Sequence, residues 1–157
     1  MFFYPMLVRL LTSRPYKIEG DSMLPTLANG QYVLLTQASP TSRSLRRGDI
    51  VVHRNPMGLE GIYVKRIIGL PDEHVRLDSG QIYINDVLLE ENHLEHDSRE
   101  EDPPINEWWN DSDEYVVMGD NCLESHDDSR AFGAVSRERI LGRVWLRYWP
   151  LKGWGVI

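Results

Sequence analysis

The chain has 157 residues, a formal net charge of -7 at pH 7 and a hydrophobic fraction of 41%. The length suits one compact domain, residues 1–157, and the hydrophobic fraction excludes a globally disordered chain. Because phosphate binding relies on clustered Lys and Arg, the acidic balance argues against nucleic acid as a partner. Cys122 is the only cysteine, so an intrachain disulfide is excluded and the redox compartment stays open.

The N-terminal residues 1–12 form an apolar arm that Pro5 and Arg9 interrupt. The arm falls short of the roughly 20 residues that span a bilayer, and it lacks the charged start and the cleavage site of a secretory signal. Two interpretations stay open: a hydrophobic strand or arm of the domain, and a short anchor at the membrane surface.

Short runs of Val, Ile, Leu and Tyr between turn residues predict strands, and no long stretch has the helical period of 3.6 residues. The predicted fold class is therefore all-β. Turn residues on both sides of Gln81–Ile84 predict consecutive hairpins. We expect strands over Tyr32–Thr36, Asp49–His53, Gly61–Ile68, His74–Leu77, Gln81–Ile84, Tyr115–Met118 and Leu141–Tyr148.

Two polar connections interrupt this pattern, residues 37–47 and the acidic residues 90–113. The second belongs to a small β or loop excursion over about residues 86–113. This excursion is either a lid or an ordinary solvated surface. The C-terminal residues 145–154 concentrate aromatic side chains beside cations, which both a membrane-interface belt and core packing would explain.

Ser22 is a candidate nucleophile in the segment Gly20–Thr26. Pro25 biases Leu24 toward an extended backbone, which favours an exposed, stiff loop. A serine is weakly nucleophilic without an adjacent base, and a lone loop serine is more often an ordinary turn residue. The base must therefore come from elsewhere in the chain.

Lys65 is the candidate base. Strand alternation puts Tyr63, Lys65 and Ile67 on one face of the strand. Apolar neighbours on that face would desolvate the ammonium and lower the pKa of Lys65, as a lysine that deprotonates a serine requires. The alternative is a lysine that lays its stem on apolar surface and extends its charge into water.

A third polar segment, residues 119–133, follows a predicted strand. If it is extended, Asp128 and Arg130 project to the same side and form an ion pair that braces the loop around Lys65. The alternative is a plain surface turn.

Together, these segments resemble the signal peptidase I family, in the family's order. Ser22–Thr26 resembles its nucleophile box, residues 47–52 its next strand and residues 63–71 its lysine box; residues 119–121 with 128–130 and Gly133 resemble its last box. The resemblance implies a mostly antiparallel β fold of the signal peptidase catalytic-core type. It also implies a serine endopeptidase, without cofactor or metal, that removes signal or leader peptides from precursor proteins after small residues, as in Ala-X-Ala.

The same resemblance implies that Ser22 attacks the scissile carbonyl, that Lys65 takes and returns the proton, and that the Ser22 N–H is one oxyanion donor. Ser125, Asp128 and Arg130 would support this Ser-Lys dyad. Three features depart from the family pattern. The family's usual long N-terminal membrane anchor is absent or reduced to residues 1–11, as in a short member of the family. Gly20 stands where some members have a serine as second oxyanion donor, and two residues separate Ser125 from Asp128 where one is common.

The family places such an enzyme at the cytoplasmic membrane with its active site on the extracytoplasmic side. The N-terminal arm and the C-terminal aromatics would then contact the membrane surface. Alternatives are a soluble cytoplasmic protease that matures a metalloenzyme precursor, and an inactive β-scaffold that binds peptides by strand addition. The Ser-Lys autopeptidases of damage-response repressors also have a Gly-Asp-Ser-Met start, but they require a longer segment before the serine.

Two other chemistries are less favoured. A triad of Ser22, His126 and Asp127 or Asp128 is conceivable, but Ser22 lacks the G-x-S-x-G elbow. His93 and His96 have a spacing that suggests a metal site, but no further ligand motif accompanies them, and a solvated loop is the favoured interpretation.

Overall fold

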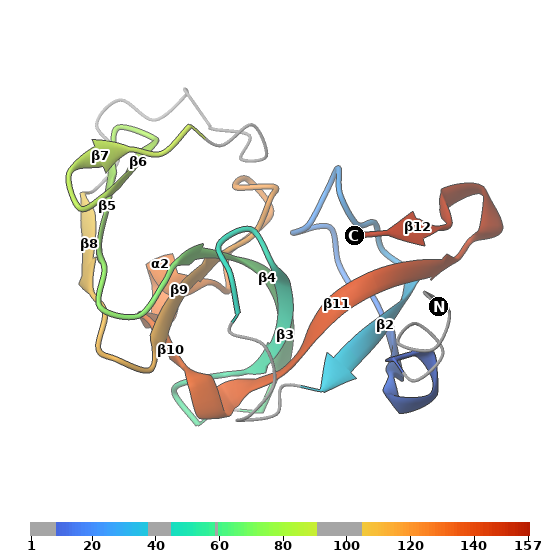
Figure 1. The fold of residues 1–157 in the computed structure, drawn as a ribbon. Coiled ribbons are helices and arrows are strands. Elements are labelled where there is room, and N and C mark those ends of the chain that lie inside the picture. Colours follow the sequence, from blue (N-terminus) through green and yellow to red (C-terminus); the bar gives the residue numbers. More distant parts are fainter. Residues whose placement is uncertain (1–8, 38–44, 59, 91–104) are drawn as a thin grey trace.

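The computed structural model describes residues 9–37, 45–58, 60–90 and 105–157. These residues form two sheets in which every strand pair is antiparallel (Figure 1). The predicted fold class is thus confirmed. Most of the N-terminal arm, the centre of the first polar connection, and residues 91–104 with His93 and His96 lie outside the described residues.

The larger sheet has the strand order β1-β2-β11-β3-β4-β9-β10, with β12 paired to β11. Its strands are β1 (Arg14–Lys17), β2 (Tyr32–Gln37), β3 (Ile50–Arg54), β4 (Ile62–Gly69), β9 (Glu114–Met118), β10 (Val135–Ser136), β11 (Ile140–Trp149) and β12 (Gly155–Val156). The long strand β11 lies between β2 and β3 (Figure 1), so it joins β1 and β2 to the rest of the larger sheet.

The smaller sheet has the order β7-β6-β5-β8. Its strands are β5 (His74–Asp78), β6 (Gln81–Ile84), β7 (Val87–Leu88) and β8 (Asn106–Trp109). Among the described residues the short helices are α2 (Ser129–Phe132), η1 (Arg137–Arg139) and η2 (Leu151–Gly153), and residues 9–12 at the described end of the N-terminal arm are also helical rather than a strand. No helix in this described part is both long and apolar enough to cross a membrane.

All seven predicted strands are present, and their ends differ from the prediction by at most one residue. The two predicted hairpins around β6 are also confirmed, as β5 and β7 flank it. The strands β1, β7, β8, β10 and β12 were not predicted. Each has four residues or fewer, too short for a hydrophobic period to stand out.

The described ends of the excursion over residues 86–113 include the two edge strands of the smaller sheet, β7 and β8. Trp108 of β8 is only 9% exposed and packs with Val75 and Ile82. Trp109, which points to the opposite face, is 72% exposed and stacks on His74 with 3.8 Å between ring centroids. Burial of Trp108 therefore holds this end of the acidic stretch as a strand.

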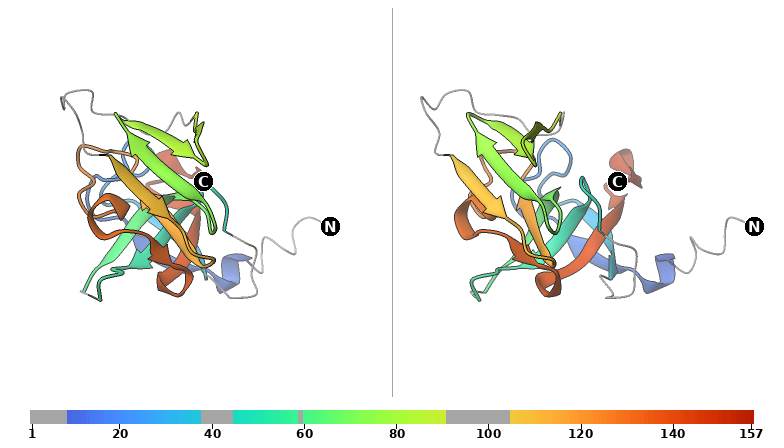
Figure 2. Two further views of the ribbon diagram at one scale, coloured as in Figure 1. Left: turned by 90° about the vertical axis from the view of Figure 1, so that its left-hand side faces the viewer. Right: turned by 60° about the vertical axis from the view of Figure 1, so that its left-hand side comes forward.

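One hydrophobic cluster joins the two sheets. Ile68, Val116 and Met118 of the larger sheet pack with Val75, Ile82 and Trp108 of the smaller sheet. The smaller sheet consequently lies against one side of the larger sheet (Figure 2).

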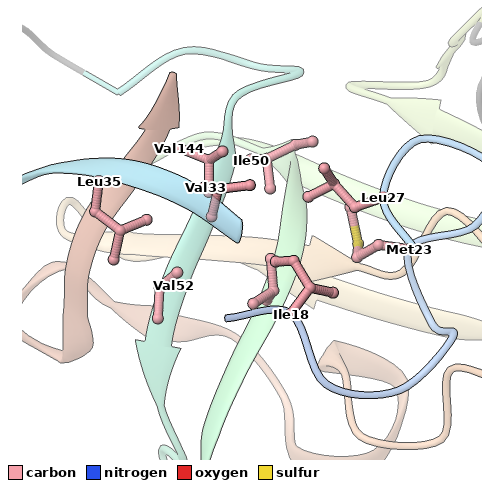
Figure 3. Packing of buried hydrophobic residues seen from close by; sticks show 9 residues of the cluster. Ile18, Met23, Leu27, Val33, Leu35, Ile50, Val52 and Val144 are labelled. Atoms are coloured by element: carbon pink, nitrogen blue, oxygen red, sulfur yellow. The ribbon is translucent and has the colours of Figure 1, made fainter. Parts of the chain in front are cut away.

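A second cluster anchors the connection between β1 and β2. Ile18, Met23 and Leu27 project from this connection onto the larger sheet (Figure 3). Their partners there are Val33, Leu35, Ile50, Val52, Val64 and Val144. Hydrophobic packing thus fixes the segment that contains Ser22.

Candidate active site

Ser22 lies in a tight turn of the β1–β2 connection. The neighbouring Met23 and Leu27 are 1% and 0% exposed, whereas Ser22 itself is partly exposed. The Leu24 N–H donates to the carbonyl of Asp21 at 3.1 Å, and the Leu27 N–H donates to that of Met23 at 2.8 Å. The buried side chains hold the turn down while Ser22 stays at the surface.

Lys65 lies in the middle of β4 and is only 3% exposed. Its partner in the sheet is Val51, which is 0% exposed and belongs to the same hydrophobic cluster as Ile67. Burial lowers the pKa of Lys65 below its usual value, and this outweighs the negative charges of Asp128 and Asp127, which raise it. The neutral amine is therefore favoured at a lower pH than for an exposed lysine.

The amine of Lys65 is held by a hydroxyl. Lys65 Nζ donates to Ser125 Oγ at 3.1 Å, and Ser125 Oγ donates to Asp128 Oδ2 at 2.6 Å. Within the described part of the chain, no carboxylate forms an ion pair with Lys65. The additional residue between Ser125 and Asp128 therefore does not prevent Ser125 from reaching both partners.

Asp128 and Arg130 form an ion pair with 2.9 Å between Arg130 Nη2 and Asp128 Oδ2. The extended backbone considered for this segment is wrong after Asp128, because Asp128 caps the helix α2 and accepts from the Arg130 N–H at 3.0 Å. Arg130 Nη2 also donates to the carbonyl of Ser125 at 2.6 Å. The ion pair thus braces the loop that carries Ser125.

The pKa of Asp128 is lower than usual. Burial by itself raises this pKa, but the hydrogen bonds and charge of Arg130, with the hydroxyl of Ser125, outweigh burial. Asp128 is therefore ionised at neutral pH, and its charge is matched by Arg130 rather than by Lys65.

The turn of Ser22 and the loop of Ser125 meet at Gly119. A Cβ on Gly119 would lie 2.3 Å from Ser125 Oγ and 2.6 Å from the carbonyl oxygen of Ser22, so a side chain there would separate the two. The Asn121 N–H donates to that same carbonyl at 3.0 Å. The Ser22 turn therefore lies beside the loop whose Ser125 binds Lys65. No hydrogen bond joins Ser22 Oγ to Lys65 Nζ.

A buried ion pair that the sequence analysis missed lies beside this site. Arg66 Nε and Nη2 donate to the two carboxylate oxygens of Asp120 at 2.7 and 2.6 Å, and Asp120 is 0% exposed. Thr26 Oγ1 donates to Asp120 Oδ2 at 2.5 Å. Arg66 shares a face of a predicted strand with Val64 and Ile68, so its need for a buried partner could have been foreseen.

His53 was also missed. It is 0% exposed and lies opposite Tyr63 in the sheet, on the face of Lys65, with its ring against Phe132 at 5.7 Å between centroids. Burial lowers the pKa of His53 to about 4. The ring is therefore neutral at neutral pH and adds no positive charge beside Lys65.

The structure does not assemble the alternative triad. His126 is exposed, and no hydrogen bond connects it to Ser22, Asp127 or Asp128, all four of which are described.

Comparisons with known proteins identify the family of this chain. The family model described as "Signal peptidase, peptidase S26" matches residues 1–149. The chain belongs to the signal peptidase I family. Signal peptidase I of Leptolyngbya laminosa is 34% identical over 159 residues, covering 94% of this chain and 74% of the relative. Signal peptidase I U of Bacillus subtilis is 35% identical over 150 residues, covering 91% and 79%.

A solved structure of a signal peptidase I from Enterococcus faecalis is also similar, with a TM-score of 0.56 and 29% identity. The match covers 66% of this chain and 98% of that chain. Membership of the signal peptidase I family makes this protein a serine protease that acts on precursor proteins with signal peptides.

We expect Asp120→Ala to destabilise this signal peptidase I by about 3–5 kcal/mol, because it leaves the Arg66 guanidinium buried without its counter-ion. Asp78→Ala is the matched control, since Asp78 pairs with Arg76 where both side chains are partly exposed, and such a loss costs about 1 kcal/mol or less. Urea denaturation measures both free energies of unfolding. Equal losses of unfolding free energy in the two variants would contradict the conclusion that Arg66 depends on Asp120 as its buried counter-ion.

Proposed function

We propose that this enzyme cleaves signal or leader peptides after small residues, as in Ala-X-Ala, with Ser22 as nucleophile and Lys65 as general base. The observation that carries the proposal is the burial of Lys65, 3% exposed and without a carboxylate partner among the described residues, beside the loop that contacts the Ser22 turn. The specificity for small residues rests on the resemblance to the family.

In the proposed first step, neutral Lys65 accepts the proton of Ser22 Oγ while that oxygen attacks the scissile carbonyl carbon. The Ser22 N–H donates to the oxyanion, whose charge develops only in the transition state. The Lys65 ammonium then gives its proton to the leaving amine, and an ester of Ser22 remains.

In the second step, Lys65 takes a proton from water, whose oxygen attacks the ester carbonyl carbon. The proton then returns to Ser22 Oγ, and the carboxylate product leaves. One lysine thus serves both steps, because it is neutral at the start of each.

Ser125, Asp128 and Arg130 support the dyad in this proposal. Ser125 Oγ accepts the hydrogen bond of Lys65 Nζ at 3.1 Å and restricts the rotation of a long, flexible side chain. Asp128 fixes Ser125, and Arg130 balances the charge of Asp128. A free carboxylate so close to Lys65 would stabilise the ammonium and oppose its role as a base.

We also propose that the C-terminal part of the chain contacts the membrane surface, with the active site on the extracytoplasmic side. Trp149, Leu151, Trp154 and Val156 are 51%, 73%, 63% and 75% exposed, and Lys152 lies among them. Tryptophan and lysine beside apolar side chains suit the boundary between headgroups and acyl chains.

Ser22→Ala and Lys65→Ala should each lower kcat/KM for a peptide ending in Ala-X-Ala before the scissile bond by at least about 10³-fold. Lys65→Arg should fail equally, because arginine stays protonated. Chromatographic assay of the products measures the rates, with Ser136→Ala and Lys17→Arg as matched controls. Appreciable hydrolysis by the Ser22→Ala protein would refute the mechanism.

The value of kcat/KM should rise with pH through the lowered pKa of Lys65, because only the neutral amine accepts the proton. Asp127→Asn should move this rise to lower pH, since the charge of Asp127 raises the pKa of Lys65. Initial rates across pH for the parent, Asp127→Asn and the distant control Asp78→Asn test the assignment. A flat profile, or a shift to higher pH, would count against Lys65 as the base.

The protein should float with vesicles of phosphatidylcholine and phosphatidylglycerol in a density gradient. Trp154→Ser should lower the partition coefficient about tenfold or more, because burying a large apolar side chain contributes about 1.5–3 kcal/mol. Trp109→Ser is the control, an exposed tryptophan on the smaller sheet. A parent protein that stays in the aqueous fraction would support the soluble maturation protease instead.

A further inference from the structure

The turn that carries Ser22 is held at its far end, Thr26, from two sides. The hydroxyl of Thr26 donates to Asp120 Oδ2 at 2.5 Å. The carbonyl of Thr26 accepts from Arg147 Nη1 at 3.0 Å. The first contact belongs to the buried ion pair beside Lys65, whereas the second comes from the long strand β11.

Arg147 also binds the C-terminal end of the chain. Its Nε donates to the carbonyl of Gly153 at the end of η2. A Cβ on Gly153 would lie 3.1 Å from Arg147 Nε and 3.4 Å from Cζ, so the guanidinium lies directly against this glycine. In Figure 1 the β1–β2 connection and β12 lie beside each other, as this bridge requires.

The guanidinium of Arg147 donates its hydrogen bonds to backbone carbonyl groups. Among the described residues no carboxylate forms an ion pair with it, so its hydrogen bonds to Thr26 and Gly153 are the contacts that hold the guanidinium. Hydrogen bonds from a charged donor are stronger than neutral ones, and a planar guanidinium can direct two of them along different edges. Lysine cannot reproduce both directions.

We propose that Arg147 is a positioning residue, through which the C-terminal segment η2–β12 holds the Ser22 turn in its reactive position. The proposal rests on the proposed role of Ser22 as nucleophile. The hydrogen bond from the Leu27 N–H to the Met23 carbonyl closes the turn between Ser22 and the point where Arg147 binds. Displacement of a nucleophile by about 1 Å can cost about 10²-fold in rate.

Arg147→Gln should lower the rate constant for acylation, expressed per titrated active site, by about 10- to 100-fold with little change in KM. The pH at which the rate rises should stay unchanged, because the bond between Lys65 and Ser125 is untouched. Arg147→Lys should recover part of the rate. Arg143→Gln is the matched control, since Arg143 lies in the same strand and binds Asp49 instead.

A second pair of variants leaves Arg147 in place. Gly153→Ala pushes a methyl group against the guanidinium and should lower the acylation rate severalfold. Gly155→Ala should leave the rate unchanged, because no atom of the described residues lies within 4 Å of a Cβ there. This pair tests the bridge even if Arg147→Gln fails to fold.

Hydrogen exchange provides a readout that is independent of peptidase activity. Arg147→Gln and Gly153→Ala should speed the exchange of the amides of Leu24 and Leu27, whereas Gly155→Ala should not. If the parent protein cleaves no peptide but Arg147→Gln and Gly153→Ala still speed this exchange, the bridge is supported and only the proposed function is refuted. Unchanged exchange, or equal acylation rates for Gly153→Ala and Gly155→Ala, would overturn the role of Arg147.

Discussion

The burial of Lys65 without a counter-ion is the constraint around which the site is organised. The next residue, Arg66, points to the opposite face of β4 and has a complete ion pair with Asp120. Lys65 has a hydroxyl partner instead, because Asp128 is bound by Arg130. Two adjacent basic residues of one strand therefore differ in their environment. The charge of Arg66 is balanced by Asp120, whereas burial lowers the pKa of Lys65.

Both sheets contribute to this arrangement. Trp108 of the smaller sheet donates from its indole N–H to the carbonyl of Ser129 at 3.2 Å, and the Val117 N–H of the larger sheet donates to the hydroxyl of Ser129 at 2.8 Å. Ser129 directly follows Asp128 in the chain, so these bonds hold the start of α2. The helix start in turn fixes Ser125, and the smaller sheet is thus part of the support of Lys65 rather than a separate appendage.

Much of the fold could be predicted, because the longer strands have local patterns. β4 and β11 are apolar enough to be found from composition and turn residues, and the face of Lys65 follows from the alternation of side chains. β8 could not be found in this way, since its role depends on Trp108 reaching a core built by other strands. The helix at Asp128 was missed because a capping aspartate is also typical of a turn.

The sequence by itself determined the family boxes, the strand that carries Lys65 and the face of that strand on which Lys65 lies, because each of these depends on residues close together in the chain. Only the tertiary structure decided which groups meet. The partners of Lys65 with Ser125, of Arg66 with Asp120 and of Arg147 with Thr26 are 60, 54 and 121 residues apart. No local pattern encodes such pairs, since their geometry exists only once the strands have taken their order in the sheet.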